Sequence, residues 1–209
     1  MNAHRKLIRR TSLVAATGVA ALVLAACGGG SSHDMGSMES GSSPSATASA
    51  SVKAGDHNAA DVTFAKDMIQ HHRQAVDMAE LAATRASSSE IKDLATKIKG
   101  AQDPEIKTMS GWLTSWGEQV PQAMGGHDMP SGMPGMMSMD DMTKLETAKG
   151  AEFDKMFAEM MIKHHEGAIE MAKTEKAEGT YDSAKKLADA VITAQTAEIE
   201  QMNKMLGKS

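Results

Sequence analysis

The sequence predicts an all-α fold, a four-helix bundle assembled from two copies of one helical hairpin. The first observation behind this prediction is an internal repeat: 19 of the 53 positions from 61 to 113 are identical to the residues 93 positions later. The second is that apolar residues recur at helical spacing in both copies. The third is a break inside each copy, at Ser87-Ser88-Ser89 and near Gly179, that suits a tight turn between helices. A repeat of this length is typical of a duplicated structural unit.

The first helix of each copy is amphipathic. On a helical wheel with about 100° per residue, Phe64, Met68 and Met78 share one arc with His71 and His72, and charged residues fill the opposite side. Both histidines therefore belong to the face that a bundle would bury. The pattern predicts helices at roughly 61–86, 89–116, 150–178 and 182–206, with a short additional helix at 140–148.

The N-terminal region resembles an export signal that ends in a lipid-attachment site. Residues 1–26 combine a basic start with an apolar run too short for a comfortable membrane span, and they end in Leu24-Ala25-Ala26 before Cys27. Cys27 is the only cysteine, so an intramolecular disulfide is excluded. We expect a lipoprotein signal peptide and lipidation of Cys27, with a buried free thiol or an uncleaved anchor helix as alternatives.

The predicted domain organisation follows from composition. Residues 27–58 hold the lipidated cysteine and a Gly/Ser/Met tether that has too little apolar surface to fold. Residues 59–207 form the duplicated four-helix domain, with a Met-rich loop at 117–149 that is either a crossover along the bundle or a loose excursion. We expect the mature protein to sit at the extracytoplasmic face of the cell membrane, attached to it through its lipid.

Charge and missing motifs exclude several classes of function. The chain has a net charge of −5, and its acidic residues all follow Cys27. Nucleic-acid binding requires a basic footprint, so it is not expected. The sequence shows no Ser/His/Asp triad, phosphate loop or reactive cysteine, and a binding protein is therefore favoured over an enzyme.

Helical-hairpin geometry predicts one polar layer inside the bundle. If the first turn is centred near residue 87, His71 lies level with residue 103, close to Gln102 and Glu105. The second hairpin repeats this arrangement. Because buried polar groups are costly unless they are paired, the layer indicates either a metal site or a hydrogen-bonded network. The candidate ligands are His71, His72, His164, His165, Glu105, Glu198, Met68 and Met161.

Methionine is concentrated in the loop between the two copies. Residues 124–142 contain seven Met together with His127, in a stretch rich in Gly, Pro and Ser. Thioethers are soft ligands that suit Cu(I) or Ag(I), whereas a loop of this composition has no structural need for an oxidisable apolar side chain. Ordinary low complexity is the alternative. The candidate loop ligands are His127, Met129, Met133, Met136, Met137 and Met139.

The duplicated motif resembles a known family. The run from Asp154 to Ala172, with Met-Met-Ile-x-His-His-Glu-Gly-Ala-Ile-Glu-Met-Ala, and its counterpart in the first copy are similar to the family called domain of unknown function 305. The resemblance covers roughly residues 58–207. It implies a ferritin-like helical fold and, as in some members, extracytoplasmic copper binding and tolerance. It also implies the two His-His pairs with Met68 and Met161 as ligands, and no established catalytic activity.

These observations favour a lipid-anchored protein that binds Cu(I) as a buffer or chaperone. One alternative is a ferritin-like di-metal oxidase with Glu105 and Glu198 as carboxylate ligands. The alternative metals are iron and zinc. Against the oxidase, Met68 and Met161 occupy the positions where that class places the Glu of a Glu-x-x-His pair. Another alternative is a non-metal structural or interaction module with a pH-sensitive histidine core. The sequence indicates no particular protein partner.

Overall fold

The computed structural model describes residues 56–123 and 132–208, which form five helices and no strand. The expectations for residues 1–55, including the signal peptide, Cys27 and most of the tether, lie outside the described residues. No helix within the described ranges is long and apolar enough to cross a membrane. The helices are α1 (Ala59–Arg85), α2 (Ser89–Trp116), α3 (Met139–Thr147), α4 (Gly150–Glu178) and α5 (Asp182–Met205).

Local capping explains why the long helices begin and end where they do. Asn58 caps α1 by accepting from the backbone N–H groups of Ala60 and Asp61, and Asp61 accepts in return from the Asn58 N–H. Ser88 caps α2, which ends at Gly117 in the left-handed conformation that glycine adopts without strain. The predicted all-α class and helix positions are confirmed, with the predicted ends close to those observed.

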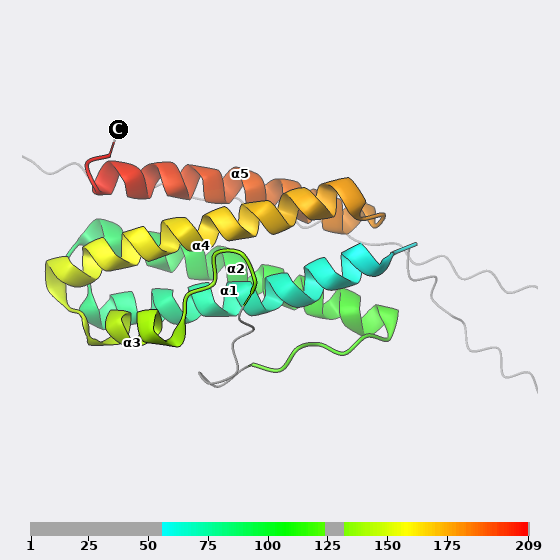
Figure 1. Ribbon diagram of the computed structural model, residues 1–209, viewed down its shortest axis with the longest axis horizontal. Coiled ribbons are helices and arrows are strands. Elements are labelled where there is room, and N and C mark those ends of the chain that lie inside the picture. Colours follow the sequence, from blue (N-terminus) through cyan, green and yellow to red (C-terminus); the bar gives the residue numbers. More distant parts are fainter. Residues whose placement is uncertain (1–55, 124–131, 209) are drawn as a thin grey trace, which may run out of the picture. The chain divides into compact units, whose positions relative to one another are not determined.

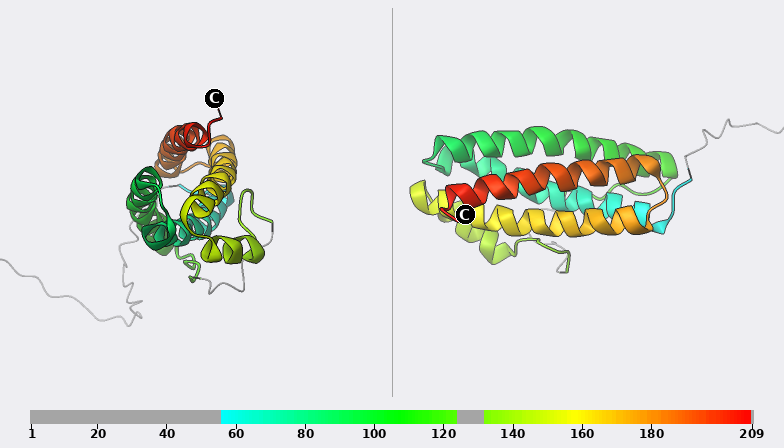
Figure 2. Two further views of the ribbon diagram at one scale, coloured as in Figure 1. Left: turned by 90° about the vertical axis from the view of Figure 1, so that its left-hand side faces the viewer. Right: turned by 90° about the horizontal axis from the view of Figure 1, so that it is seen from above.

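The helices form two antiparallel hairpins, α1–α2 and α4–α5, that pack together mainly through α1 and α4 (Figures 1 and 2). A short parallel bridge joins Ala86, just after α1, to Gly150 at the start of α4. The chain therefore leaves α2 at one end of the bundle and enters α4 at the other. The connection between them links opposite ends of the bundle, as the crossover of the ferritin-like topology does.

An aspartate at the start of each inner helix caps the turn of the other hairpin. Asp61 of α1 is fully buried and accepts from the backbone N–H groups of Thr180 and Tyr181. Asp154 of α4, its counterpart in the repeat, accepts from the backbone N–H groups of Ser87 and Ser88. This reciprocal capping explains why the aspartate occurs in both copies and fixes how the hairpins dock.

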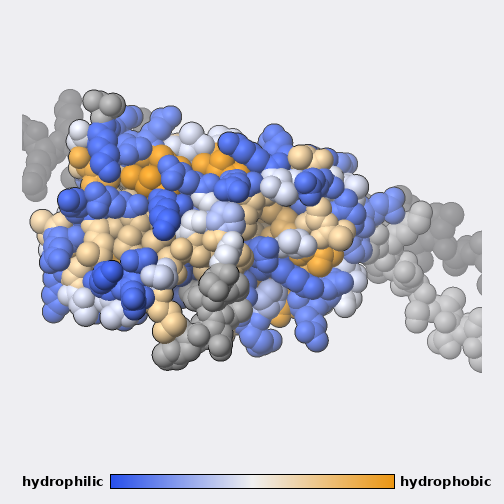
Figure 3. Space-filling model, in the orientation of Figure 1, coloured by the Kyte–Doolittle hydropathy of each residue, from blue (hydrophilic) through white to orange (hydrophobic). Residues whose placement is uncertain are grey.

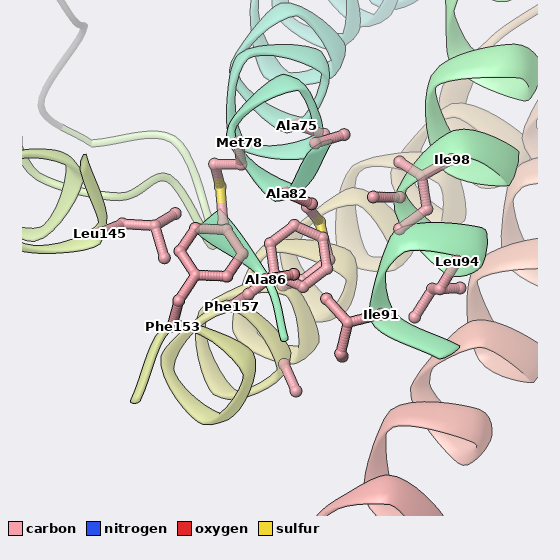
Figure 4. Close-up of a cluster of buried hydrophobic side chains, with 14 of the residues drawn as sticks. Ala75, Met78, Ala82, Ala86, Ile91, Leu94, Ile98, Leu145, Phe153 and Phe157 are labelled. Atoms are coloured by element: carbon pink, nitrogen blue, oxygen red, sulfur yellow. The ribbon is translucent and has the colours of Figure 1, made fainter. Parts of the chain in front are cut away.

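Two apolar clusters fill the bundle, one in each half of its length. Figure 4 shows the first, where the rings of Phe153 and Phe157 stack with centroids 5.8 Å apart beside Met78 and Leu145. The second gathers around Phe64 and several alanines near the opposite end. On the face seen in Figure 3, hydrophobic side chains also show between α4 and α5. The level between the two clusters is where the histidines lie.

Candidate metal centre

The two inner helices bring the His-His motifs together at the middle of the bundle. His71 of α1 and His164 of α4 face each other with ring centroids 3.7 Å apart, and the four histidines of both motifs are fully buried. The two rings come from equivalent positions in the repeat, so they meet close to the approximate two-fold axis. The prediction that hairpin docking joins the two motifs is confirmed.

The outer histidine of each motif is paired with a glutamate of its own hairpin. His72 Nε2 lies 2.7 Å from Glu105 Oε2, and His165 Nε2 lies 2.6 Å from Glu198 Oε2. Glu105 and Glu198 thus lie at the histidine level, as the hairpin geometry predicts. Since an ionised carboxylate can only accept, each pair places a ring hydrogen on Nε2, so Nδ1 is the ring atom that can offer a lone pair.

Burial keeps the two inner imidazoles neutral. It lowers the pKa of His71 to about 3, with a further lowering from neighbouring His72. Burial, followed by the proximity of His71, also lowers the pKa of His164 well below its ordinary value. A neutral imidazole is the form that binds a metal ion.

The histidine layer leaves several buried polar atoms without a hydrogen-bond partner among the described residues. They include Nδ1 of all four histidines and, for His164, Nε2 as well. The amide oxygens of Gln102 and Gln195, two buried residues, also have no hydrogen-bond partner among the described residues. Buried polar groups are almost always satisfied, so this set indicates that the layer accommodates a further group. A cation is the fitting kind, because each of these imidazole rings can offer the lone pair of one nitrogen and each amide oxygen can offer a lone pair as well.

Two methionines border the same layer. Met68 and Met161 are fully buried, one helical turn before His71-His72 and His164-His165 respectively. At this spacing the thioether and an imidazole lie on the same face of one helix.

Within residues 56–123 and 132–208, no group of three or more His, Cys, Asp or Glu side chains is disposed to hold a metal ion. The two glutamates each bind the ring of their own hairpin rather than a shared position. This arrangement weighs against the di-metal oxidase, in which carboxylates bridge two metals. A metal in this layer would draw its ligands from imidazole together with thioether or amide groups.

The structure separates the predicted loop ligands into three groups. His127 and Met129 lie outside the described residues. Met133, Met136 and Met137 precede α3, and the side chain of Met137 is buried in the apolar cluster around Phe153. Met139 opens α3 and is 42% exposed, the one large hydrophobic side chain of the described residues that is strongly exposed.

Two buried polar features were not predicted from the sequence. Gln74 is fully buried and holds the backbone of Met137, and Gly167 is its counterpart in the second copy. The sequence signal that could have indicated them is the mismatch between Gln74 and Gly167 inside an otherwise matching motif. Glu175 is also buried, beside Asp61, and burial together with that carboxylate raises the pKa of Glu175 to about 8. Its counterpart is Ala82, so the repeat gave no indication of it.

The fold and the layer define a class of duplicated helical bundles with a buried His-His pair in each copy. The family model described as Domain of unknown function (DUF305) matches residues 61–206. The chain belongs to this family, which confirms the resemblance seen in its motifs. Comparison with curated proteins gave no match.

Solved structures of the family share the fold. A DUF305 protein from Streptomyces coelicolor is 33% identical, with 71% of this chain and 93% of that chain covered and a TM-score of 0.65. CopM in the Cu(II)-bound form is 38% identical, with 69% and 94% covered and a TM-score of 0.60. CopM in the Cu(I)-bound form is 35% identical over the same shares, with a TM-score of 0.58.

Proposed function

We propose that this chain is a copper-binding protein that holds Cu(I) in its histidine layer and serves as an extracytoplasmic buffer or chaperone. One observation carries the proposal: His72 and His165 donate through Nε2 to a glutamate, and His71 does so to a backbone carbonyl, while their Nδ1 atoms stay buried without a partner. Histidines that bind metals commonly donate their other ring N–H to such an oxygen, which fixes the tautomer and makes the ligand more basic.

The thioethers favour Cu(I) over zinc or iron. Met68 and Met161 are buried beside the histidines, and thioether sulfur is a soft ligand that Cu(I) accepts readily. Zinc prefers imidazole with thiolate or carboxylate. Glu105 and Glu198, the carboxylates at this level, already bind ring N–H groups. The solved Cu(I)-, Cu(II)- and silver-bound forms of CopM support copper as the metal.

A competition titration tests the proposal. Metal-free protein, purified without an affinity tag, is titrated with Cu(I) against a chromogenic chelator, in parallel with Zn(II) and Fe(II). The double variant Met68→Leu/Met161→Leu keeps most of the packing volume, so we expect it to bind Cu(I) more weakly by at least about ten-fold. Met78→Leu, another fully buried methionine, lies about two helical turns beyond His71 and is the matched control. A preference of the wild type for iron or zinc would contradict the proposal.

The location at the membrane is a separate part of the proposal, supported by the sequence of residues 1–27. Cys27 receives the lipid, and the following residues tether the bundle. The Cys27→Ser variant is expected to lose labelling by a fatty-acid probe and to escape processing by lipoprotein signal peptidase. Continued labelling and membrane retention of this variant would overturn the lipid anchor without affecting the metal site.

A further inference from the structure

The segment Met133–Met137, which we call the strap, lies across the middle of α1 and α4 and can be followed in Figure 1 just before α3. Gln74 of α1 fixes one end of it. The Gln74 side chain accepts from the Met137 N–H at 2.7 Å and donates to the Met137 carbonyl at 3.0 Å. Both polar atoms of a fully buried amide are therefore satisfied by the backbone of one residue, as in a pair of β-strands.

Gly167 of α4 makes room for the other part of the strap. A Cβ atom at Gly167 would lie 2.0 Å from the Pro134 carbonyl oxygen and 2.6 Å from the Gly135 nitrogen. Gly135 has a φ of +77°, and a Cβ there would lie 2.8 Å from the His164 carbonyl oxygen. The contact is backbone against backbone, which only glycine permits on either side.

This double attachment brings the Pro134 carbonyl to 3.1 Å from His71 Nε2. A carbonyl can only accept, so the ring hydrogen of His71 is on Nε2 and the lone pair is on Nδ1. The Pro134 carbonyl thus accepts the Nε2–H of His71, as Glu105 and Glu198 accept the Nε2–H of His72 and His165.

His164 is different, because neither of its ring nitrogens has a partner among the described residues. The strap therefore distinguishes two histidines that the repeat makes equivalent. The ring of His71 has a fixed acceptor at Nε2, whereas the ring of His164 has no such acceptor within hydrogen-bonding geometry in the part of the chain that the structure describes.

We propose that Gln74 and Gly167 are positioning residues of the metal layer, which hold the strap so that Pro134 fixes His71 with Nδ1 as its ligand atom. This inference rests on the proposed function, but its direct consequence is visible in the metal-free protein. Release of the strap would let the His71 ring exchange between tautomers, and metal binding would then select one of them. Gln74→Leu removes both bonds to Met137, and Gly167→Ala pushes Pro134 away from α4.

The experiment is long-range ¹H–¹⁵N NMR on full-length, metal-free protein with ¹⁵N-labelled histidine. We expect His71 to be the Nε2–H tautomer in the wild type and in the control variant Gln70→Leu, which changes the glutamine one helical turn before Gln74. We expect a mixture of tautomers in Gln74→Leu and Gly167→Ala. The Nδ1–H form of His71 in the wild type, or an unchanged His71 in both folded variants, would overturn the inference. If one variant does not fold, the other decides.

A second readout separates this inference from the proposed function. In the Cu(I) competition assay, Gln74→Leu should weaken the tightest site by about ten-fold, as the loss of an outer hydrogen bond to a metal ligand typically does, and leave the number of bound ions unchanged. If the wild type binds no Cu(I) but the tautomer of His71 responds to Gln74→Leu, the proposed function fails while the positioning role stands. If Cu(I) binds tightly and His71 does not respond, the positioning role fails alone.

Discussion

The two His–Glu pairs allow a graded test of how the layer binds a metal. The Glu105→Gln and Glu198→Gln variants keep an acceptor for the ring N–H but lose the negative charge behind bonds of 2.7 and 2.6 Å. Loss of such an outer partner typically weakens metal affinity by about 10- to 100-fold. We expect each Gln variant to bind the metal about ten-fold more weakly than the wild type, because the amide oxygen still fixes the tautomer. This loss of affinity corresponds to roughly 1.4 kcal/mol.

The Glu105→Ala and Glu198→Ala variants should lose more metal affinity, closer to about 100-fold. They leave the ring N–H of a fully buried histidine without a partner, which also lowers the free energy of unfolding by about 1–3 kcal/mol. The double Gln variant reports on stoichiometry. If both outer histidines bind one ion, its effect is about 100-fold at one site, whereas two separate sites each weaken by about ten-fold.

The assay is the Cu(I) competition titration, with chemical denaturation run on each variant. Glu166→Gln is the matched control, because it makes the same charge change on α4 beside His165 but at an exposed side chain. Cu(I) affinities for Glu105→Gln and Glu198→Gln equal to that of Glu166→Gln would show that these carboxylates do not act through a metal-binding ring.

Three further predictions concern the loop, the protonation of Glu175 and the reciprocal turn caps. Deleting residues 124–131 removes His127 and Met129 but spares the strap, so it should lower the number of Cu(I) ions bound and leave the tightest site intact; loss of tight binding in equilibrium dialysis would place the main site in the loop. Glu175 keeps its proton up to about pH 8 when folded but loses it near its ordinary pKa of 4.5 when unfolded. The wild type therefore loses up to about 1.4 kcal/mol of stability for each pH unit in that window, whereas Glu175→Gln does not. In urea unfolding, the free energy of unfolding of Glu175→Gln relative to that of the wild type should be larger at pH 8 than at pH 5. The same relative value at both pH values would show that the Glu175 carboxyl does not titrate between them. Asp154→Ala should lower the free energy of unfolding by about 1–3 kcal/mol, because the Ser87 and Ser88 N–H groups lose their acceptor; a change below about 0.5 kcal/mol, the size typical of a plain surface substitution, would mean that the cap is dispensable.

Much of the fold could be predicted from the sequence because the duplication reports the same pattern twice. Phe64 and Phe157, or Met68 and Met161, recur at one offset and at helical spacing, which defines the buried face of each inner helix. The level of the histidines followed from the turn positions alone, since an antiparallel hairpin fixes which residues lie side by side. His72 and Glu105 meet close to the level predicted from a turn near residue 87.

The strap could not be predicted, because no periodic pattern fixes where a Gly/Pro/Met-rich segment packs. Its position depends on Gln74 and Gly167, and these two residues are visible only as a mismatch between the copies. The buried carboxyl of Glu175 was missed for a similar reason. It lies near the end of α4, and its burial comes from contact with the α1 hairpin rather than from its own helix.

Anomalous diffraction at the copper edge, from crystals of the protein loaded with one equivalent of Cu(I), would show whether the histidine layer holds the metal. We expect a copper peak inside the bundle, within bonding distance of Nδ1 of at least one of His71, His72 and His165, and close to the sulfur of Met68 or Met161. Copper bound only by methionines of the 117–149 connection, with the histidine layer unchanged, would contradict it.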